Sequence, residues 1–168
     1  SVPGLKIYTP YDCDSANDIL ANWTNSKDQI VLRLERQAMP KNIIESLEED
    51  VAINHYGLIT KRGSNKLIIS WGYLGIELLE SPMFRDYDVF LFSYFNFDST
   101  NDLANLLKPY KNITITEESF SNTGLASLLL PSLINLDSHI ELRHVDKTIS
   151  EIRSHRSTLW EKFNLLKI

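Results

Sequence analysis

The sequence has few of the features that define secreted and membrane proteins. Its one cysteine, Cys13, cannot form an internal disulfide, which favours a reducing compartment, and we expect it to be a small buried hydrophobic residue. No apolar run reaches the roughly 18 to 20 residues that a membrane-spanning helix needs, and the first residues do not form a secretion signal. These absences predict a cytoplasmic protein with no membrane partner.

Basic residues are also scarce. The chain has 17 lysines and arginines against 22 aspartates and glutamates, which gives a formal net charge of -5. Proteins that bind nucleic acids normally carry a clustered basic surface that neutralises phosphates. Since the sequence has no such cluster, a nucleic acid is not an expected partner.

Common nucleotide and metal motifs are missing as well. The sequence contains no Gly-x-x-x-x-Gly-Lys-Ser/Thr loop, no Gly-x-Gly-x-x-Gly fingerprint, no His-Glu-x-x-His and no Cys-x-x-Cys. The histidines lack metal-ligand spacing, and we expect them to be surface or core residues. They are His55, His139, His144 and His155.

The composition nevertheless predicts a folded protein. Hydrophobic residues make up 43% of the chain and aromatic residues 10%, whereas disordered segments have low hydrophobicity. A length of 168 residues corresponds to about one domain with some excess. Because the first residue is Ser1 and not Met, we expect a trimmed chain or a part excised from a longer protein.

Short β-branched or aromatic runs alternate with amphipathic segments, which predicts an α/β fold. We expect three layers, with a mainly parallel sheet and helices on both faces. Strands are predicted at 5–8, 29–33, 66–71, 87–92, 113–116 and 139–142, with a hairpin over 52–60. Helices are predicted from a cap at Asp14 or Ser15 to about 23, from 71–73 to about 81, and over 100–107, 123–130 and 148–166. Pro131 should stop or kink the fourth helix, and Ile152, Leu159, Trp160 and Phe163 should form one apolar face of the last.

The segment after Pro40 is acidic and irregular as far as Asp50. Such a run of charge is typical of a solvated linker or turn. We therefore predict a domain boundary here, with one unit over residues 1–42 and a second over 43–168.

Two adjacent carboxylates, Glu117 and Glu118, follow the predicted strand at 113–116. Ligands of parallel α/β sheets collect at the carboxyl ends of strands, so this pair could bind a cation or act as acid and base. Alternatively, the carboxylates provide a favourable negative charge at the start of the next helix. The glycines of the Trp71–Gly75 turn likewise permit tight packing or ligand approach, and packing is favoured.

Several segments, taken in order, resemble the C-terminal part of the transketolase family over nearly the whole chain. The family includes transketolase, deoxyxylulose-phosphate synthase and the beta subunits of 2-oxoacid dehydrogenases. The segments are Pro3-Gly4-Leu5 with Tyr8-Thr9-Pro10-Tyr11-Asp12, Arg36-Gln37-Ala38-Met39-Pro40, Leu67 to Tyr73, Ile115 to Ser119 with Gly124-Leu125-Ala126-Ser127, and Asp146-Lys147 through Phe163-Asn164-Leu165. The resemblance implies that residues 1–42 end a pyrimidine-binding domain and that 43–168 form a transketolase C-terminal domain.

The resemblance also implies what this chain lacks. The family binds thiamine diphosphate and Mg²⁺ through a Gly-Asp-Gly motif with a downstream Asn, and activates the cofactor with a Glu; neither region is present here. In transketolases the Arg of Arg-Gln-x-x-Pro binds the substrate phosphate, which implies this role for Arg36. Arg33 is the second candidate. Glu35 departs from the small polar residue usual at its position, so Arg36 could instead pair with a carboxylate.

The leading hypothesis is therefore a C-terminal portion of a thiamine diphosphate-dependent transferase that is inactive alone. Its role would be structural, in dimerisation and as one wall of the substrate channel. Expected partners are the remaining transketolase domains or a partner subunit, in a homodimer or heterotetramer. Ketol transfer between sugar phosphates is favoured, while the synthase and 2-oxoacid dehydrogenase reactions stay open.

Two other classes of protein remain as alternatives. The first is a free-standing, noncatalytic α/β binding module, which should be monomeric and should hide its apolar faces. The second is a flavodoxin-like ligand binder, which would need a flavin or nucleotide pocket that the sequence does not indicate.

Overall fold

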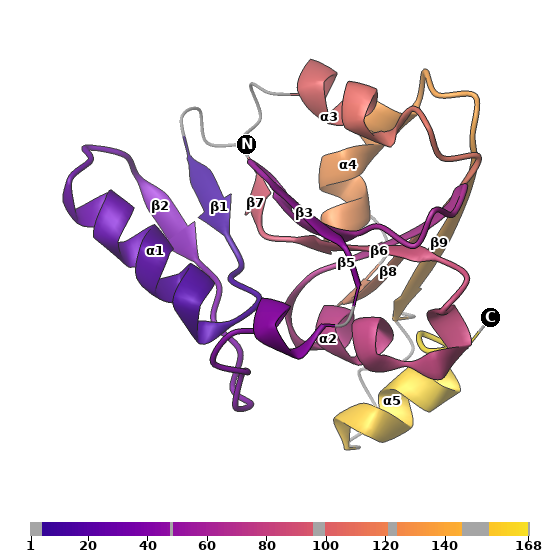
Figure 1. Ribbon diagram of the computed structural model, residues 1–168, viewed down its shortest axis with the longest axis horizontal. Coiled ribbons are helices and arrows are strands. Elements are labelled where there is room, and N and C mark those ends of the chain that lie inside the picture. Colours follow the sequence, from indigo (N-terminus) through magenta and orange to yellow (C-terminus); the bar gives the residue numbers. More distant parts are fainter. Residues whose placement is uncertain (1–4, 48, 96–99, 121–123, 146–154, 168) are drawn as a thin grey trace.

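The structure is a computed structural model that describes residues 5–47, 49–95, 100–120, 124–145 and 155–167. Within them, helices cover both faces of a central sheet, as Figure 1 shows. The predicted α/β class with a mainly parallel sheet is confirmed. No described helix is long and apolar enough to cross a membrane.

The first part of the chain forms a small sheet, which also includes one strand from later in the sequence. It contains β1 (Lys6–Tyr8), α1 (Cys13–Thr24) and β2 (Ile30–Leu32), with β1 and β2 parallel. β7 (Tyr94–Phe95) pairs with the other edge of β1 in the antiparallel direction. The predicted boundary between 42 and 43 stays a prediction, and the β1–β7 pair joins segments from either side of it.

The residue that caps α1 differs from both predicted candidates. Asp12 is the N-cap: its Oδ1 accepts from the Ser15 amide at 2.7 Å, and the Ser15 hydroxyl accepts from the Asp12 amide at 3.1 Å. This capping box places Ser15 inside the first turn. The other Asp12 oxygen accepts from the buried Ile43 amide at 3.0 Å, so Asp12 also fixes the position of the chain at Ile43. Cys13, the first residue of α1, is exposed and not buried as expected.

The main sheet has six strands, in the order β3-β4-β6-β5-β8-β9. The strands are β3 (Val51–Asn54), β4 (Gly57–Thr60), β5 (Lys66–Ser70), β6 (Asp88–Phe92), β8 (Asn112–Phe120) and β9 (His139–Val145). From β6 to β9 all neighbours are parallel, whereas β3 and β4 extend the sheet in the antiparallel direction. Every residue of β6 is buried, as expected of a central strand covered on both faces.

The helices divide between the two faces of this sheet. They are α2 (Gly72–Glu80), α3 (Thr100–Leu107), α4 (Leu125–Leu133) and α5 (Arg156–Lys162), with short 3₁₀ turns η1 (Ile44–Ser46) and η2 (Pro82–Phe84). Leucines of α3 and α4 enter one core with Phe90 and Phe92, and leucines of α2 enter the other with Trp160 of α5. Figure 1 shows these two helix pairs on opposite sides of the strands.

Several predicted element boundaries differ from the structure, and β9 continues to Val145, past its predicted end at Leu142. β8 continues to Phe120 with a register irregularity after Thr116, so Glu117 and Glu118 lie inside the strand. α4 continues past Pro131 to Leu133, because a proline near a helix end removes only one amide donor and the Ile134 amide still reaches the Leu130 carbonyl. The last helix ends at Lys162, and the predicted residues 148–154, including Ile152, lie outside the described residues.

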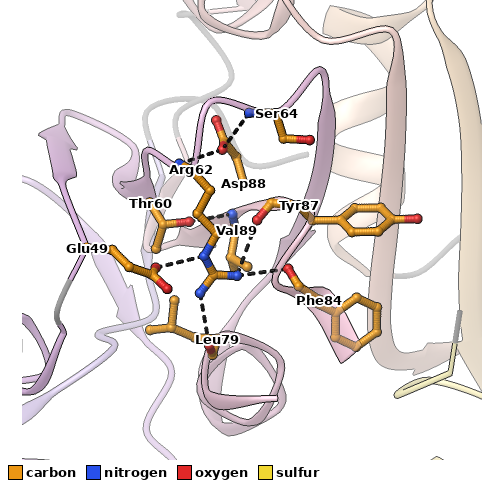
Figure 2. A network of polar contacts seen from close by, with 9 residues as sticks. All are labelled: Glu49, Thr60, Arg62, Ser64, Leu79, Phe84, Tyr87, Asp88 and Val89. Carbon is orange, nitrogen blue, oxygen red and sulfur yellow. Dashed lines mark hydrogen bonds and ion pairs between the residues drawn. The ribbon is translucent and has the colours of Figure 1, made fainter. Parts of the chain in front are cut away.

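A buried polar network ties the turn between β4 and β5 to the following elements (Figure 2). The Arg62 guanidinium donates to the carbonyls of Phe84 at 2.8 Å, Tyr87 at 3.2 Å and Leu79 at 3.2 Å, and its Nε donates to Glu49 at 2.8 Å. Arg62 therefore supplies donors to carbonyls at the end of α2 and around η2, where the helical hydrogen-bond pattern ends; the Phe84 carbonyl also accepts from the Tyr87 amide at 2.9 Å.

Asp88, at the start of β6, forms the second part of this network. Its Oδ1 accepts from the Arg62 amide at 2.9 Å, and its Oδ2 accepts from the Tyr110 hydroxyl at 2.8 Å. Burial, followed by this hydrogen bond and the negative charge of Asp88, raises the pKa of Tyr110. The network thus fixes the amino end of β6 and the turn before β5. It does not involve the carboxyl ends of the parallel strands.

Candidate functional site

Side chains from four separate segments meet beyond the carboxyl ends of β2 and β5 and beside the end of β8. We call this group the Arg156 cluster. Its members are Arg33, Glu35, Gln37, Trp71, Tyr73, Glu118, Arg156 and Trp160. Carboxyl ends of parallel strands are the usual place for ligands of α/β proteins, so this is the candidate site.

Arg156, the first residue of α5, lies at the centre of the cluster. Its guanidinium makes a two-point ion pair with Glu118 of β8, contacts Glu35 Oε2 at 3.2 Å, and donates to the Gln37 side chain. The same group lies 5.5 Å from the Tyr73 ring and 5.4 Å from the Trp160 ring. Trp160 Nε1 also donates to Glu118 at 2.6 Å, so α5 is tied to β8 by two side chains.

Arg33 and Glu35 form the inner part of the cluster. The Arg33 guanidinium stacks 4.6 Å above the Trp71 ring, and its Nη2 lies 3.9 Å from Glu35 Oε1. The Glu35 side chain is only 9% exposed. Three buried atoms here, Arg33 Nη1, Glu35 Oε1 and Trp71 Nε1, have no hydrogen-bond partner among the described residues. These unpaired donors and acceptors could form hydrogen bonds with water or with a polar group of a ligand.

The two arginines predicted to bind phosphate lie in different surroundings. Arg36 is exposed and, within the described residues, its guanidinium makes no ion pair; Glu35 instead pairs with Arg33 and Arg156. Arg33 is partly buried against Trp71. Arg36 is thus the more accessible of the two, and the phosphate-binding role of both stays a prediction.

The predicted carboxylate pair does not share one environment. Glu117 is 1% exposed, and its carboxylate accepts from the amides of Leu125 and Ala126, the first residues of α4. The N-cap of α4 is Gly124, which has no side chain, so Glu117 supplies the acceptor for these amides. Glu118 faces Arg156 and Trp160 instead. Both carboxylates are therefore occupied by internal partners, and a role for the pair in binding a cation stays untested.

Burial raises the pKa of Glu117 above its ordinary value of 4.5, although the amides of Ala126 and Leu125 partly offset this. The folded state then binds the Glu117 proton more tightly than the unfolded state does. This contribution to stability is complete below pH 4.5 and is lost as the pH rises through the raised pKa.

We therefore expect Glu117→Gln to remove one component of the pH dependence of folding. As the pH falls from about 7 toward 5, the free energy of unfolding of the wild type should rise relative to that of the variant. Urea denaturation at several pH values measures this difference. Glu80→Gln, at an exposed position, controls for the amide substitution, and a difference that shrinks toward pH 5 would contradict the assignment.

The glycines of the Trp71–Gly75 turn serve packing. A Cβ at Gly72 would overlap Glu35 Oε1, and one at Gly75 would lie 2.8 Å from the Leu91 side chain. Gly72 therefore permits the Glu35 carboxylate to reach its place in the cluster. The sequence indicated packing here, but it gave no sign that the neighbour would be Glu35.

A cavity of about 450 Å³ adjoins the cluster between α2, η2 and α5. It is lined by Gln37, Tyr73, Met83, Arg156, Trp160 and Leu166, among others. Among the described residues, no three His, Cys, Asp or Glu side chains are grouped so that they could hold a metal ion.

Sequence comparisons give no match, either to a known protein family or to a curated protein. Comparison with solved structures does give a match. A solved structure titled "Split gene transketolase, inactive beta4 tetramer" superposes with a TM-score of 0.67 at 16% sequence identity. The match covers 98% of this chain and 55% of that one. This chain therefore has a transketolase-like fold of the C-terminal kind and spans about half the length of its neighbour.

Proposed function

We propose that this protein is the C-terminal portion of a thiamine diphosphate-dependent enzyme of the transketolase type. The observation that carries the proposal is the match of nearly the whole chain to about half of a split-gene transketolase chain. The Arg-Gln-x-x-Pro segment, with Arg36 exposed beside a site at the carboxyl ends of strands, supports it. The favoured reaction is ketol transfer between sugar phosphates.

The cofactor itself would be held elsewhere. The described residues include no cluster of metal ligands, and the sequence lacks the Gly-Asp-Gly and Asn motif of the family. Thiamine diphosphate would supply the carbanion chemistry when bound by the remaining domains or a partner subunit. This chain would contribute packing, a subunit interface, one wall of the substrate channel and the phosphate-binding Arg36.

Recovery of a cofactor-binding partner tests the proposal. The tagged chain is used to capture proteins from its native lysate, and the captured proteins are identified by mass spectrometry. We expect a protein with the Gly-Asp-Gly and Asn motif, and ketol transfer from the reconstituted pair with thiamine diphosphate and Mg²⁺ but from neither protein alone. Recovery of no such protein would contradict the two-chain form, and an inactive pair would contradict the assigned reaction.

Arg36→Ala tests the phosphate role directly. In the active pair, we expect this substitution to raise KM for a phosphorylated acceptor about thirtyfold, which corresponds to about 2 kcal/mol for the loss of a charged hydrogen-bonded contact. KM for the same sugar without its phosphate should not change. Lys41→Ala removes an exposed cation from the same segment between β2 and η1 and serves as the matched control. Equal effects on both acceptors would show that Arg36 does not bind the phosphate.

A further inference from the structure

We propose that Arg156 is the residue that positions Arg36, so that the carboxyl-terminal helix α5 sets the geometry of the phosphate-binding segment. This inference rests on the proposed function, because it assigns a support to a residue of that same site. Arg156 is 120 positions from Arg36 in sequence; it lies within the last segment of the resemblance, 146–165, but the sequence assigns it no role of its own.

The contacts on either side of Arg36 carry the inference. Arg156 contacts Glu35 Oε2 at 3.2 Å and donates to the Gln37 side chain, so both sequence neighbours of Arg36 are held by one guanidinium. Residues 34–39 contain no strand or α-helix, and the backbone hydrogen bonds of the surrounding segment are made on either side of them, by Arg33 with Tyr8 and by Pro40 and Lys41 with α1. Two contacts that flank one residue define the direction in which its own side chain leaves the chain.

Arg156 is itself held firmly enough to act as an anchor. Its two-point pair with Glu118 fixes the plane of the guanidinium against β8. The Trp160 ring, which is 6% exposed, packs beside it and binds the same carboxylate. Arg156 is therefore held between its own helix, α5, and a strand of the main sheet, and regular elements hold a side chain more precisely than an irregular segment such as 34–39 does.

The charges of the cluster also separate the roles of the arginines. The positive charges of Arg33 and Arg156 are balanced by the negative charges of Glu35 and Glu118, which lie in direct contact with them. Within the described residues, no carboxylate pairs with Arg36. An incoming phosphate would thus meet one uncompensated guanidinium, held at the surface by a neutral cluster beneath it.

Substitutions at Arg156 test the positioning role, because loss of that role should affect binding of the phosphorylated acceptor and not of the unphosphorylated one. In the reconstituted pair, Arg156→Lys keeps the charge but loses the planar fork, and we expect it to raise KM for the phosphorylated acceptor about tenfold. KM for the unphosphorylated sugar should stay unchanged. In the Arg36→Ala background the same substitution should have no further effect on either acceptor, because the residue that it positions is absent.

Arg143→Lys is the matched control. Arg143 also makes a two-point pair with a glutamate, Glu141, and contacts the carbonyl of Lys167, but it does not touch residues 35–37. Its substitution should leave both KM values at the wild-type level. An Arg156→Lys variant that changes KM for both acceptors alike, or that retains its full effect without Arg36, would overturn the proposal.

A second readout requires no activity and uses this chain alone. Native trypsin digestion should cut after Arg36 at least fivefold faster in Arg156→Lys than in the wild type, while the rate after the exposed Arg85 stays unchanged. An unchanged rate after Arg36 would overturn the anchoring role. Because this readout is independent of catalysis, it distinguishes a failed anchor from a failed assignment of ketol transfer.

Discussion

Replacing Arg62 with alanine is expected to lower the free energy of unfolding by about 3 to 5 kcal/mol, the usual range when one partner of a buried charged network is removed. The side chain of Arg62 is 9% exposed, and its guanidinium satisfies three backbone carbonyls and Glu49. Truncation would remove the Arg62 donors from the carbonyls of Leu79 and Tyr87 (Figure 2), and would leave the Phe84 carbonyl with the Tyr87 amide. Urea denaturation monitored by tryptophan fluorescence measures the loss.

Two control substitutions separate this network from a simple ion pair. Glu49→Gln removes the charge of a partner that is 32% exposed and should cost only about 1 kcal/mol, because the three carbonyl contacts remain. Arg85→Ala, at an exposed position three residues before Asp88, should have an effect within about 0.5 kcal/mol. A loss at Arg62 no larger than that at Glu49 would show that the carbonyl contacts contribute little.

The second large effect is expected at Gly57. This residue begins β4 with φ at 148°, and a Cβ there would overlap the Leu91 carbonyl oxygen of the neighbouring strand β6. Gly57→Ala therefore combines an unfavourable backbone conformation with a clash against main-chain atoms that cannot move independently. We expect a loss of about 3 kcal/mol or more in the free energy of unfolding, measured by the same urea titration.

Gly63→Ala is the matched control for backbone conformation alone. Gly63 also has a positive φ, 75°, but nothing lies within 4 Å of the position that a Cβ would occupy. Its substitution should cost only about 1 kcal/mol, from strain in the left-handed region. Equal losses at both glycines would mean that β4 and β6 can separate enough to admit a methyl group.

The sequence predicted the parts of the fold that depend on local patterns. Within β6 the run from Val89 to Phe92 is apolar throughout because both faces of the strand are covered, and α3 lies over the residues predicted for it. The end of β8 was missed, since Glu117 and Glu118 do not look like strand residues. They continue the strand because each carboxylate has a partner from elsewhere in the chain, namely the α4 amides and Arg156.

The candidate site depends even more on contacts between distant segments, which local sequence patterns do not predict. The resemblance identified the segment that carries Arg36, but it did not identify Arg156, whose contacts join residues as far apart as 37 and 156. No spacing or motif encodes such a contact, because it depends on where α5 packs against β8. The departure at Glu35 from the family pattern was the one local signal, and it is explained by the two arginines that Glu35 contacts.

The pairing of β1 with β7 has a consequence for how this chain folds. Tyr8 lies opposite Tyr94, so the small sheet acquires its third strand only after a loop of more than 80 residues has closed. Closing such a loop costs chain entropy, so we expect the β1–β7 pair to form once β6, which directly precedes β7, is already part of the main sheet. The small sheet would then be completed after the main sheet, and during synthesis the free edge of β1 would remain unpaired until residue 95 has emerged from the ribosome.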